Sequence, residues 1–232
     1  MHFPTQDFFD LSTYEHSALF LAQSEVWEAL KQIESYLKSI PLGRIEGDVS
    51  SRAYLINPEL IFVGAGSIVE PGAYIQGPCW IGKNCTIRHG AYIRGNVITG
   101  EGCVIGHDSE VKASIFLNKA HAAHFAYVGD SILGHEVNLG AGTKCANLKL
   151  NHQPISIRKN NQRIDTGLRK LGAIIGDGCQ LGCNSVTNPG TLMGPRGSSY
   201  PCLNFGGFIP AGSTIKPSAG VIISSNGTRC GA

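Results

Sequence analysis

The sequence predicts an all-β fold, a parallel β-helix of six-residue repeats, on three observations. An aliphatic residue recurs every six positions over nine repeats, with a single threonine as the exception. A mostly small residue follows four positions later, and glycine often follows directly. No single repeat of such a short period can bury its own apolar side, so stacked repeats must supply a continuous core. The nine positions are Val63, Val69, Ile75, Ile81, Ile87, Ile93, Thr99, Ile105 and Val111.

The composition agrees with one solenoid domain. The chain has 232 residues, 30 of them glycine, and only 16% are charged. A solenoid turns a corner every few residues and uses glycine where φ is positive. The net charge of +2 is too small to indicate a nucleic-acid or membrane partner. No stretch reaches the roughly 20 apolar residues of a membrane helix, and residues 1–7 lack a basic start with an apolar run. We therefore expect a cytoplasmic protein.

Four of the eight cysteines are expected to pack in the core. No Cys-x-x-Cys pair is present, which argues against a common metal or redox motif. Cys79, Cys85, Cys103 and Cys179 all occupy the small inward position of the repeat. Free cysteine behaves as a small apolar residue there. We expect no metal site and no disulfide framework.

Residues 1–45 are predicted to form a helical arm that precedes the solenoid. Ser24 is a candidate N-cap, and Pro41 ends the pattern. Such an amphipathic helix would pack against the solenoid or a neighbouring subunit. The apolar residues at helical spacing are Val26, Leu30, Ile33 and Leu37.

The β-helix is predicted over residues 46–222, with interruptions. The period is lost between Phe116 and Asp130, which indicates a loop or a site. It vanishes in 149–170, a basic stretch, and then resumes in phase, so this segment is predicted to be an excursion from the scaffold.

Two further segments depart from the repeat. Prolines and glycines in 194–207 predict a second excursion, because they disfavour regular structure. Residues 223–232 are predicted to be a flexible tail.

His124 is a candidate general base because it lies in the loss of period, in the sequence His-Ala-Ala-His-Phe-Ala-Tyr. An imidazole with a pKa near 6.5 accepts a proton readily at neutral pH. The alternative is an ordinary surface histidine. Asn138 and Asn147 follow on later turns and would add polar groups to the same solenoid.

Arg94 and Lys112 are candidate phosphate ligands. Each directly follows an inward aliphatic residue, and the eighteen residues between them equal three repeats. On a three-sided helix they would lie one above the other. Two stacked cations can bind a phosphate, arginine as a fork and lysine as a point charge. The alternative is two solvated surface charges.

These motifs resemble a known family. The repeats resemble the left-handed β-helix of hexapeptide acyltransferases. Residues 124–130, 138–143 and 147 are similar to the acetyltransferase half of the bifunctional glucosamine-1-phosphate N-acetyltransferase and N-acetylglucosamine-1-phosphate uridylyltransferase. Residues 169–176 are closer to the archaeal-type sugar-1-phosphate enzymes. The resemblance covers roughly residues 63–190.

The resemblance implies an N-acetyltransferase that uses acetyl-CoA and acts on an amino-sugar 1-phosphate, glucosamine-1-phosphate before others. It implies a homotrimer with CoA in the groove between solenoids. His124 would be the base, with Asn147 beside it and the acetyl group. The other implied roles are sugar-phosphate binding by Arg94, Lys112, Tyr127, Asn138 and Lys170, and acetyl-CoA binding by Ala141, Cys183 and Asn184.

The chain departs from this family in two respects. Leu148 follows Asn147 where the bacterial enzymes carry a tyrosine, so an aromatic of the acetyl site is missing. No glycine-rich nucleotidyltransferase start is present, and uridylyl transfer is not expected.

Three alternatives stay open. The first is a UDP-sugar acyltransferase that uses acyl carrier protein. The second is a zinc hydratase of the γ-carbonic anhydrase type, although the spacing of His107, His121 and His124 does not match that class. The third is a non-catalytic sugar-phosphate binding or scaffold protein.

Overall fold

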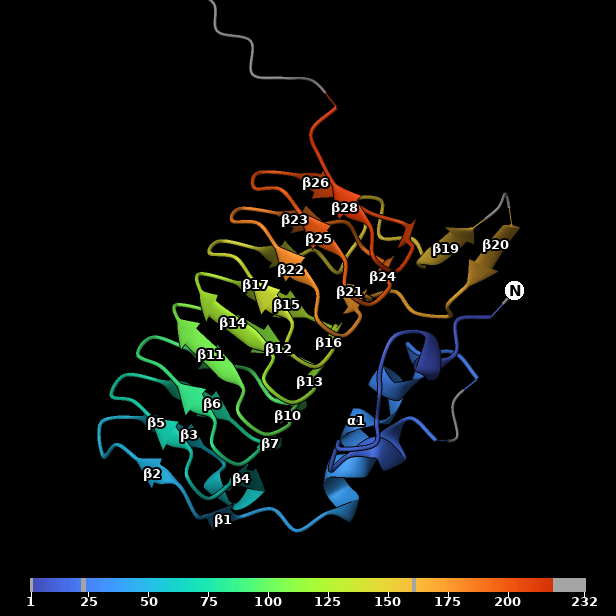
Figure 1. The fold of residues 1–232 in the computed structure, drawn as a ribbon. Coiled ribbons are helices and arrows are strands. Elements are labelled where there is room, and N and C mark those ends of the chain that lie inside the picture. Colours follow the sequence, from blue (N-terminus) through green and yellow to red (C-terminus); the bar gives the residue numbers. More distant parts are fainter. Residues whose placement is uncertain (1, 22–23, 160–161, 219–232) are drawn as a thin grey trace, which may run out of the picture.

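The computed structural model describes residues 2–21, 24–159 and 162–218. A parallel β-solenoid with three sheets follows a short helical arm (Figure 1). The predicted all-β parallel helix of hexapeptide repeats, with its short N-terminal helical segment, is confirmed. The predicted tail, 223–232, lies outside the described residues.

Each sheet takes one short strand from each coil. Sheet A consists of β1 (Arg44–Ile45), β4 (Ile61–Val63), β7 (Cys79–Ile81), β10 (Val97–Thr99), β13 (Ser114–Phe116), β16 (Ile132–Leu133), β21 (Ala173–Ile175), β24 (Thr191–Met193) and β27 (Phe208–Ile209). Sheet B consists of β2 (Asp48–Val49), β5 (Ile68–Val69), β8 (Thr86–Ile87), β11 (Val104–His107), β14 (His121–His124), β17 (Asn138–Leu139), β22 (Gln180–Leu181), β25 (Ser198–Ser199) and β28 (Thr214–Ile215). Sheet C consists of β3 (Tyr54–Ile56), β6 (Tyr74–Gln76), β9 (Tyr92–Ile93), β12 (Glu110–Lys112), β15 (Tyr127–Gly129), β18 (Lys144–Cys145), β23 (Val186–Thr187) and β26 (Asn204–Phe205).

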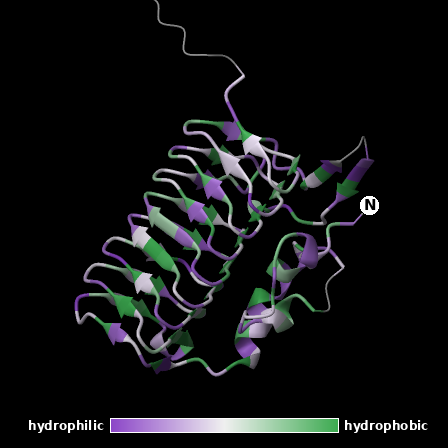
Figure 2. Ribbon diagram, in the orientation of Figure 1, coloured by the Kyte–Doolittle hydropathy of each residue, from purple (hydrophilic) through white to green (hydrophobic). Residues whose placement is uncertain are grey.

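The six-residue period places one aliphatic side chain of each strand inside the prism. In sheet C, Ile75 pairs with Ile93, which pairs with Val111, and all three are fully buried. Hydrophobic segments accordingly recur in each coil (Figure 2). The four cysteines at the inward position are also buried, as predicted. Burial raises the pKa of Cys79 to about 12, which keeps its thiol protonated.

The loss of period after Val111 is not a loop. Inward residues continue at Phe116 and Val128 on regular strands, and only the spacing changes. The corner between sheets C and A is one residue shorter here, with Ala113 and Asp130 in left-handed backbone. A shortened corner therefore shifts the sequence period while the stack itself continues.

Residues 149–170 form an excursion, because β16 pairs directly with β21 across it. Within it β19 (Ser156–Lys159) and β20 (Gln162–Asp165) make an antiparallel hairpin that the sequence analysis did not predict. Ile155 and Ile157 at the start of this hairpin are buried against the outer side of sheet A.

The predicted excursion at 194–207 is wrong. This segment contains β25 and β26, which pair in register with β22 and β23. Pro195 and Pro201 follow strand ends and lie at corners, where no ladder hydrogen bond is required of them. The inward positions hold Ser199 and Phe205 instead of aliphatic residues. The repeat could therefore not be recognised here from the sequence.

The N-terminal arm covers the outer face of sheet A. It contains η1 (Thr5–Asp7), η2 (Ser17–Leu19) and α1 (Glu28–Ser39), and η3 (Pro58–Leu60) lies between β3 and β4. Trp27, Ile33 and Leu37 belong to one apolar cluster with Phe62 and Trp80 of sheet A. No helix within the described ranges is long and apolar enough to cross a membrane.

The helix is confirmed, but the predicted N-cap is wrong. The helix starts at Glu28 and its N-cap position, Trp27, makes no side-chain cap. The hydroxyl of Ser24 instead donates to the Glu28 carboxylate at 3.0 Å. The glutamate thus turns back to the preceding segment, which sequence spacing could not distinguish from a serine cap.

We expect His16 to make the stability of the protein depend on pH. Its Nδ1 lies 2.9 Å from the Tyr36 hydroxyl, and its ring packs edge-on against Trp80. Burial lowers the pKa of His16 from 6.5 to about 4. The unfolded chain binds this proton at higher pH than the folded chain, so the free energy of unfolding should fall as pH drops from about 6.5 to 4, by up to about 3 kcal/mol.

Urea denaturation at pH 7.5 and 4.5 measures this loss in the wild type and in His16→Leu. We expect the variant to lose about 2–3 kcal/mol less than the wild type between the two pH values. Equal losses in both proteins would assign the pH dependence to other groups.

Candidate functional site

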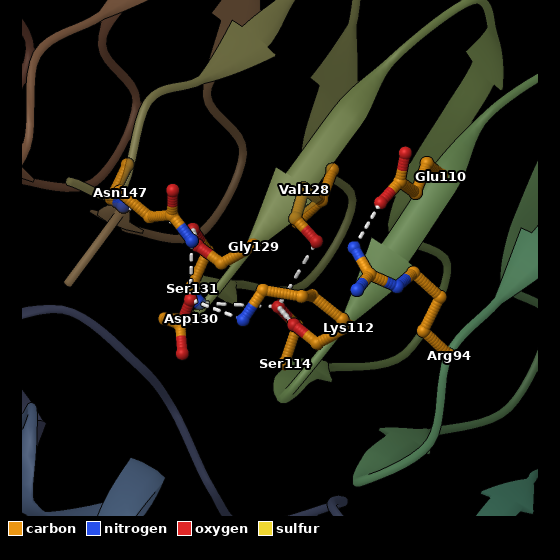
Figure 3. A network of polar contacts seen from close by, with 10 residues as sticks. Arg94, Glu110, Lys112, Ser114, Val128, Gly129, Asp130, Ser131 and Asn147 are labelled. Atoms are coloured by element: carbon orange, nitrogen blue, oxygen red, sulfur yellow. Dashed lines mark hydrogen bonds and ion pairs between the residues drawn. The ribbon is translucent and has the colours of Figure 1, made fainter. Parts of the chain in front are cut away.

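Two corners of the solenoid carry the predicted site residues, with the exception of Asn138 on sheet B. The corner between sheets C and A holds Arg94 and Lys112, which follow the paired residues Ile93 and Val111 on adjacent coils. The two cations therefore lie one coil apart, as the eighteen-residue spacing predicts. Figure 3 shows them with the polar side chains around them.

Each cation has a carboxylate partner. The Arg94 guanidinium donates to Glu110 at 2.6 Å, and the Lys112 ammonium donates to Asp130 at 2.7 Å. The lysine pair is well buried, with side chains 16% and 17% exposed. The hydrogen bond to Glu110 raises the pKa of Arg94. A guanidinium has five N–H donors and an ammonium three, so both keep donors for a bound anion.

Tyr127 and Asn147 complete this corner. The Asn147 amide donates to the Asp130 carboxylate, which also accepts from Lys112 (Figure 3). A Cβ at Gly129 would lie 2.7 Å from the Tyr127 hydroxyl and 2.8 Å from the Asn147 Nδ2, so only glycine permits this approach. Burial raises the pKa of Tyr127, and the charge of Asp130 adds to it. The tyrosine is therefore a neutral hydrogen-bonding group at pH 7.

Lys170 is at the base of the excursion. It forms an isolated antiparallel bridge with Leu148, and the next residue, Leu171, donates to the Asn147 carbonyl at 3.0 Å. This bridge places Lys170, which is exposed, beside the corner that carries Asn147. The excursion returns to the stack at this corner.

The corner between sheets B and C holds His124, exposed at the end of β14. Backbone hydrogen bonds stack successive coils there. Gly142 donates to the His124 carbonyl, and Asn184 donates to the Ala141 carbonyl. His124, Ala141 and Cys183 thus follow one another on three consecutive coils, and Asn184 comes directly after Cys183.

The structure separates His124 from the cation corner within one chain. Strand β15, of three residues, lies between the corners, and a strand rises about 3.3 Å per residue. His124 ends β14 of sheet B, whereas Asn147 follows β18 at the far end of sheet C and pairs with Asp130, so one strand of sheet C separates the two in the single chain. The Arg94 side chain extends from the cation corner over the outer face of sheet C, where its guanidinium lies 5.8 Å from the Tyr92 ring centre.

Asn138 lies apart from both corners. It is the outward residue of β17 and pairs with His121 and Gln180 on sheet B. Any role for it in the same site requires a molecule, or a neighbouring subunit, that extends over sheet B.

Sequence reasoning missed Glu110, Asp130 and Phe125. The two carboxylates occupy outward or corner positions, where the repeat accepts many residue types. Glu110 is sixteen residues after Arg94, and Asp130 is eighteen residues after Lys112. Both spacings are close to one coil and could have indicated that the charges lie side by side. No three His, Cys, Asp or Glu side chains of the described residues gather in a way that could hold a metal ion.

A family model described as the GMPPB C-terminal domain matches residues 75–198, more than half of the chain. A bifunctional sugar-1-phosphate nucleotidylyltransferase/acetyltransferase of Sulfurisphaera tokodaii is 38% identical over 88 residues, which are 38% of this chain and 22% of that protein. The bifunctional protein GlmU of Methanocaldococcus jannaschii is 37% identical over 82 residues, which are 35% and 20% of the two chains. The matched part thus spans about a fifth of these relatives.

Two further similarities cover more of the chain. The acetyltransferase YaiX of Escherichia coli, named as uncharacterized, is 31% identical over 186 residues, 79% of this chain and 80% of that one. The solved structure of a Francisella novicida UDP-N-acetylglucosamine acyltransferase superposes with a TM-score of 0.56 at 15% identity, over 75% and 67% of the two chains. This last match shows the fold alone.

The fold and these relatives define the class as left-handed β-helix proteins of hexapeptide repeats, a class of acetyltransferases. The chain belongs to the GMPPB C-terminal domain family. An acetyltransferase class implies an acyl-CoA donor.

Proposed function

We propose that the protein is an acetyl-CoA-dependent N-acetyltransferase that acts on an amino-sugar 1-phosphate, with glucosamine-1-phosphate the first candidate. The single observation that carries this proposal is the corner between sheets C and A. Two cations with spare donors lie there beside a neutral tyrosine and a carboxamide, one short strand from an exposed histidine.

The chemistry follows from these groups. Arg94 and Lys112 hold the sugar phosphate, and Lys170 closes over it. Tyr127 orients the sugar, together with Asn138 on sheet B of a neighbouring subunit. His124 takes a proton from the sugar ammonium, because only the free amine can attack a carbonyl. The nitrogen forms a bond to the thioester carbon and releases a second proton to solvent, the carbon–sulfur bond breaks, and CoA leaves as a thiol that takes its proton from the His124 imidazolium.

The donor binds along the corner between sheets B and C, where Ala141, Cys183 and Asn184 follow His124 on successive coils. Sheet A is covered by the arm, so sheets B and C are the faces available to other subunits. We propose a homotrimer in which a neighbouring solenoid completes the groove, which would let Asn147 of one subunit act beside the acetyl group.

The assay incubates the protein with glucosamine-1-phosphate and acetyl-CoA and follows free thiol. Parallel samples replace the donor with acetylated acyl carrier protein, and the acceptor with UDP-glucosamine or unphosphorylated glucosamine. We expect thiol release that requires acetyl-CoA and the sugar phosphate. Release only with the carrier protein and the UDP-sugar would favour the first alternative. Sugar-phosphate binding without turnover would favour a scaffold role.

Replacing Arg94 by methionine tests the phosphate site. A lost charge-assisted hydrogen bond costs about 1.5–3 kcal/mol, so we expect KM for the sugar phosphate to rise about 10- to 100-fold while KM for acetyl-CoA stays constant. Arg88→Met, on the same coil but at the corner between sheets B and C, is the control. Equal effects of the two substitutions would remove Arg94 from the proposed site.

A further inference from the structure

Phe125 has a backbone conformation that suits it poorly. Its φ is 51°, in the left-handed region, at the corner between sheets B and C. The same corner position on the neighbouring coils is held by Gly90, Asp108 and Gly142. Glycine, asparagine and aspartate tolerate left-handed backbone best, and a bulky aromatic residue tolerates it least. Phe125 is therefore strained where its neighbours are not.

Packing does not compensate for this strain. The Phe125 side chain is 53% exposed, so much of its apolar surface stays in water. Its ring meets His107 edge-on at 5.4 Å and lies 6.1 Å from the His124 ring. Neither local conformation nor burial accounts for a phenylalanine here. Strain of this kind is concentrated at functional sites, where a particular side chain must be held in place.

The surroundings indicate what the ring would contact. Phe125 directly follows the proposed base, and Ala141 and Cys183 of the proposed donor groove lie on the next coils of the same corner. The sugar-phosphate groups lie at the opposite end of β15. An apolar ring on the donor side suits the acyl part of a thioester, not the sugar.

We propose that Phe125 is the specificity-determining residue for the acyl group, a wall beside His124 that excludes water from the thioester and restricts the acyl chain to a short one. This inference rests on the proposed function, because it assumes an acyl-CoA donor at this corner. One extra methylene against such a wall is worth a factor of about 10 to 200.

The test compares acetyl-CoA and butyryl-CoA with the wild type, Phe125→Gly and Phe125→Tyr. We expect Phe125→Gly to keep or raise the unfolding midpoint, since it relieves the strained backbone, yet to lower the acetyl-to-butyryl ratio of kcat/KM at least 10-fold. Phe125→Tyr retains the ring and should retain the ratio. The matched control is Cys202→Gly, an exposed left-handed position of the same corner, which should leave the ratio unchanged.

The affinities of both acyl-CoAs are also measured by calorimetric titration, so that the result does not depend on turnover. An unchanged affinity ratio in Phe125→Gly overturns the inference alone. Failure of acetyl-CoA to bind the wild type overturns the inference together with the proposed function. Dissociation of an oligomer by Phe125→Gly, seen in size-exclusion chromatography, also overturns it, because the ring would then serve a subunit contact.

Discussion

Replacing His124 by alanine is expected to lower kcat/KM for amino-sugar acetylation by about 10²- to 10⁴-fold, the range that general-base catalysis contributes. His124 is exposed at the end of β14, so alanine removes the proton acceptor without opening a cavity in the core. The unfolding midpoint should therefore stay the same. Free thiol released from acetyl-CoA measures the rate.

Two histidines of the same region serve as controls. His107 is paired with His124 on the preceding coil, and its ring stacks on His89 at 5.4 Å. His121 is on the same strand as His124 and faces outward from sheet B. We expect both alanine variants to retain activity within a few-fold of the wild type. If His107→Ala lost as much activity as His124→Ala, the base would have to be reassigned within this corner.

The largest effect on stability is expected from Gly106→Ala. A Cβ at this position would lie 1.7 Å from the carbonyl oxygen of Ala123 on the next coil. Both groups are backbone in a continuous ladder, so neither can move without shifting the coils. We expect a loss of about 3–5 kcal/mol in the free energy of unfolding, measured by urea denaturation.

Gly207→Ala separates crowding from backbone conformation. Gly207 has a φ of 80°, and an added Cβ would meet no atom within 4 Å. Its cost should be only that of left-handed backbone, about 1–2 kcal/mol. A loss at Gly106 no larger than this would show that the coils are less tightly stacked than the structure indicates.

The sequence was sufficient to predict the architecture because the repeat itself forms the core. Every coil must bury one side chain per strand, so the six-residue period from Val63 to Val111 directly reports the stack. The same logic failed where the inward residue was unusual, as at Ser199 and Phe205, or where a corner lost one residue, as at Ala113. The six-residue period could not predict the hairpin β19–β20, because this hairpin lies outside the stacked coils.

The candidate site was predictable only in part. The register of Arg94 and Lys112 followed from the period. Their partners Glu110 and Asp130 did not, because outward positions accept many side chains and ion pairs depend on side-chain direction. His124 and Asn147 lie at different corners because of where the strands before them end. Strands this short do not have ends that can be predicted from the sequence. The strain at Phe125 is a backbone property that composition cannot reveal.

The most direct test of the proposed reaction is a crystal structure of the protein with CoA and glucosamine-1-phosphate. The proposal predicts the phosphate on Arg94 and Lys112, the sugar amine within hydrogen-bond reach of His124, about 3 Å, and the CoA sulfur beside the same imidazole. A sugar phosphate bound at this corner with its amine directed away from every His124 imidazole of the assembly would contradict it.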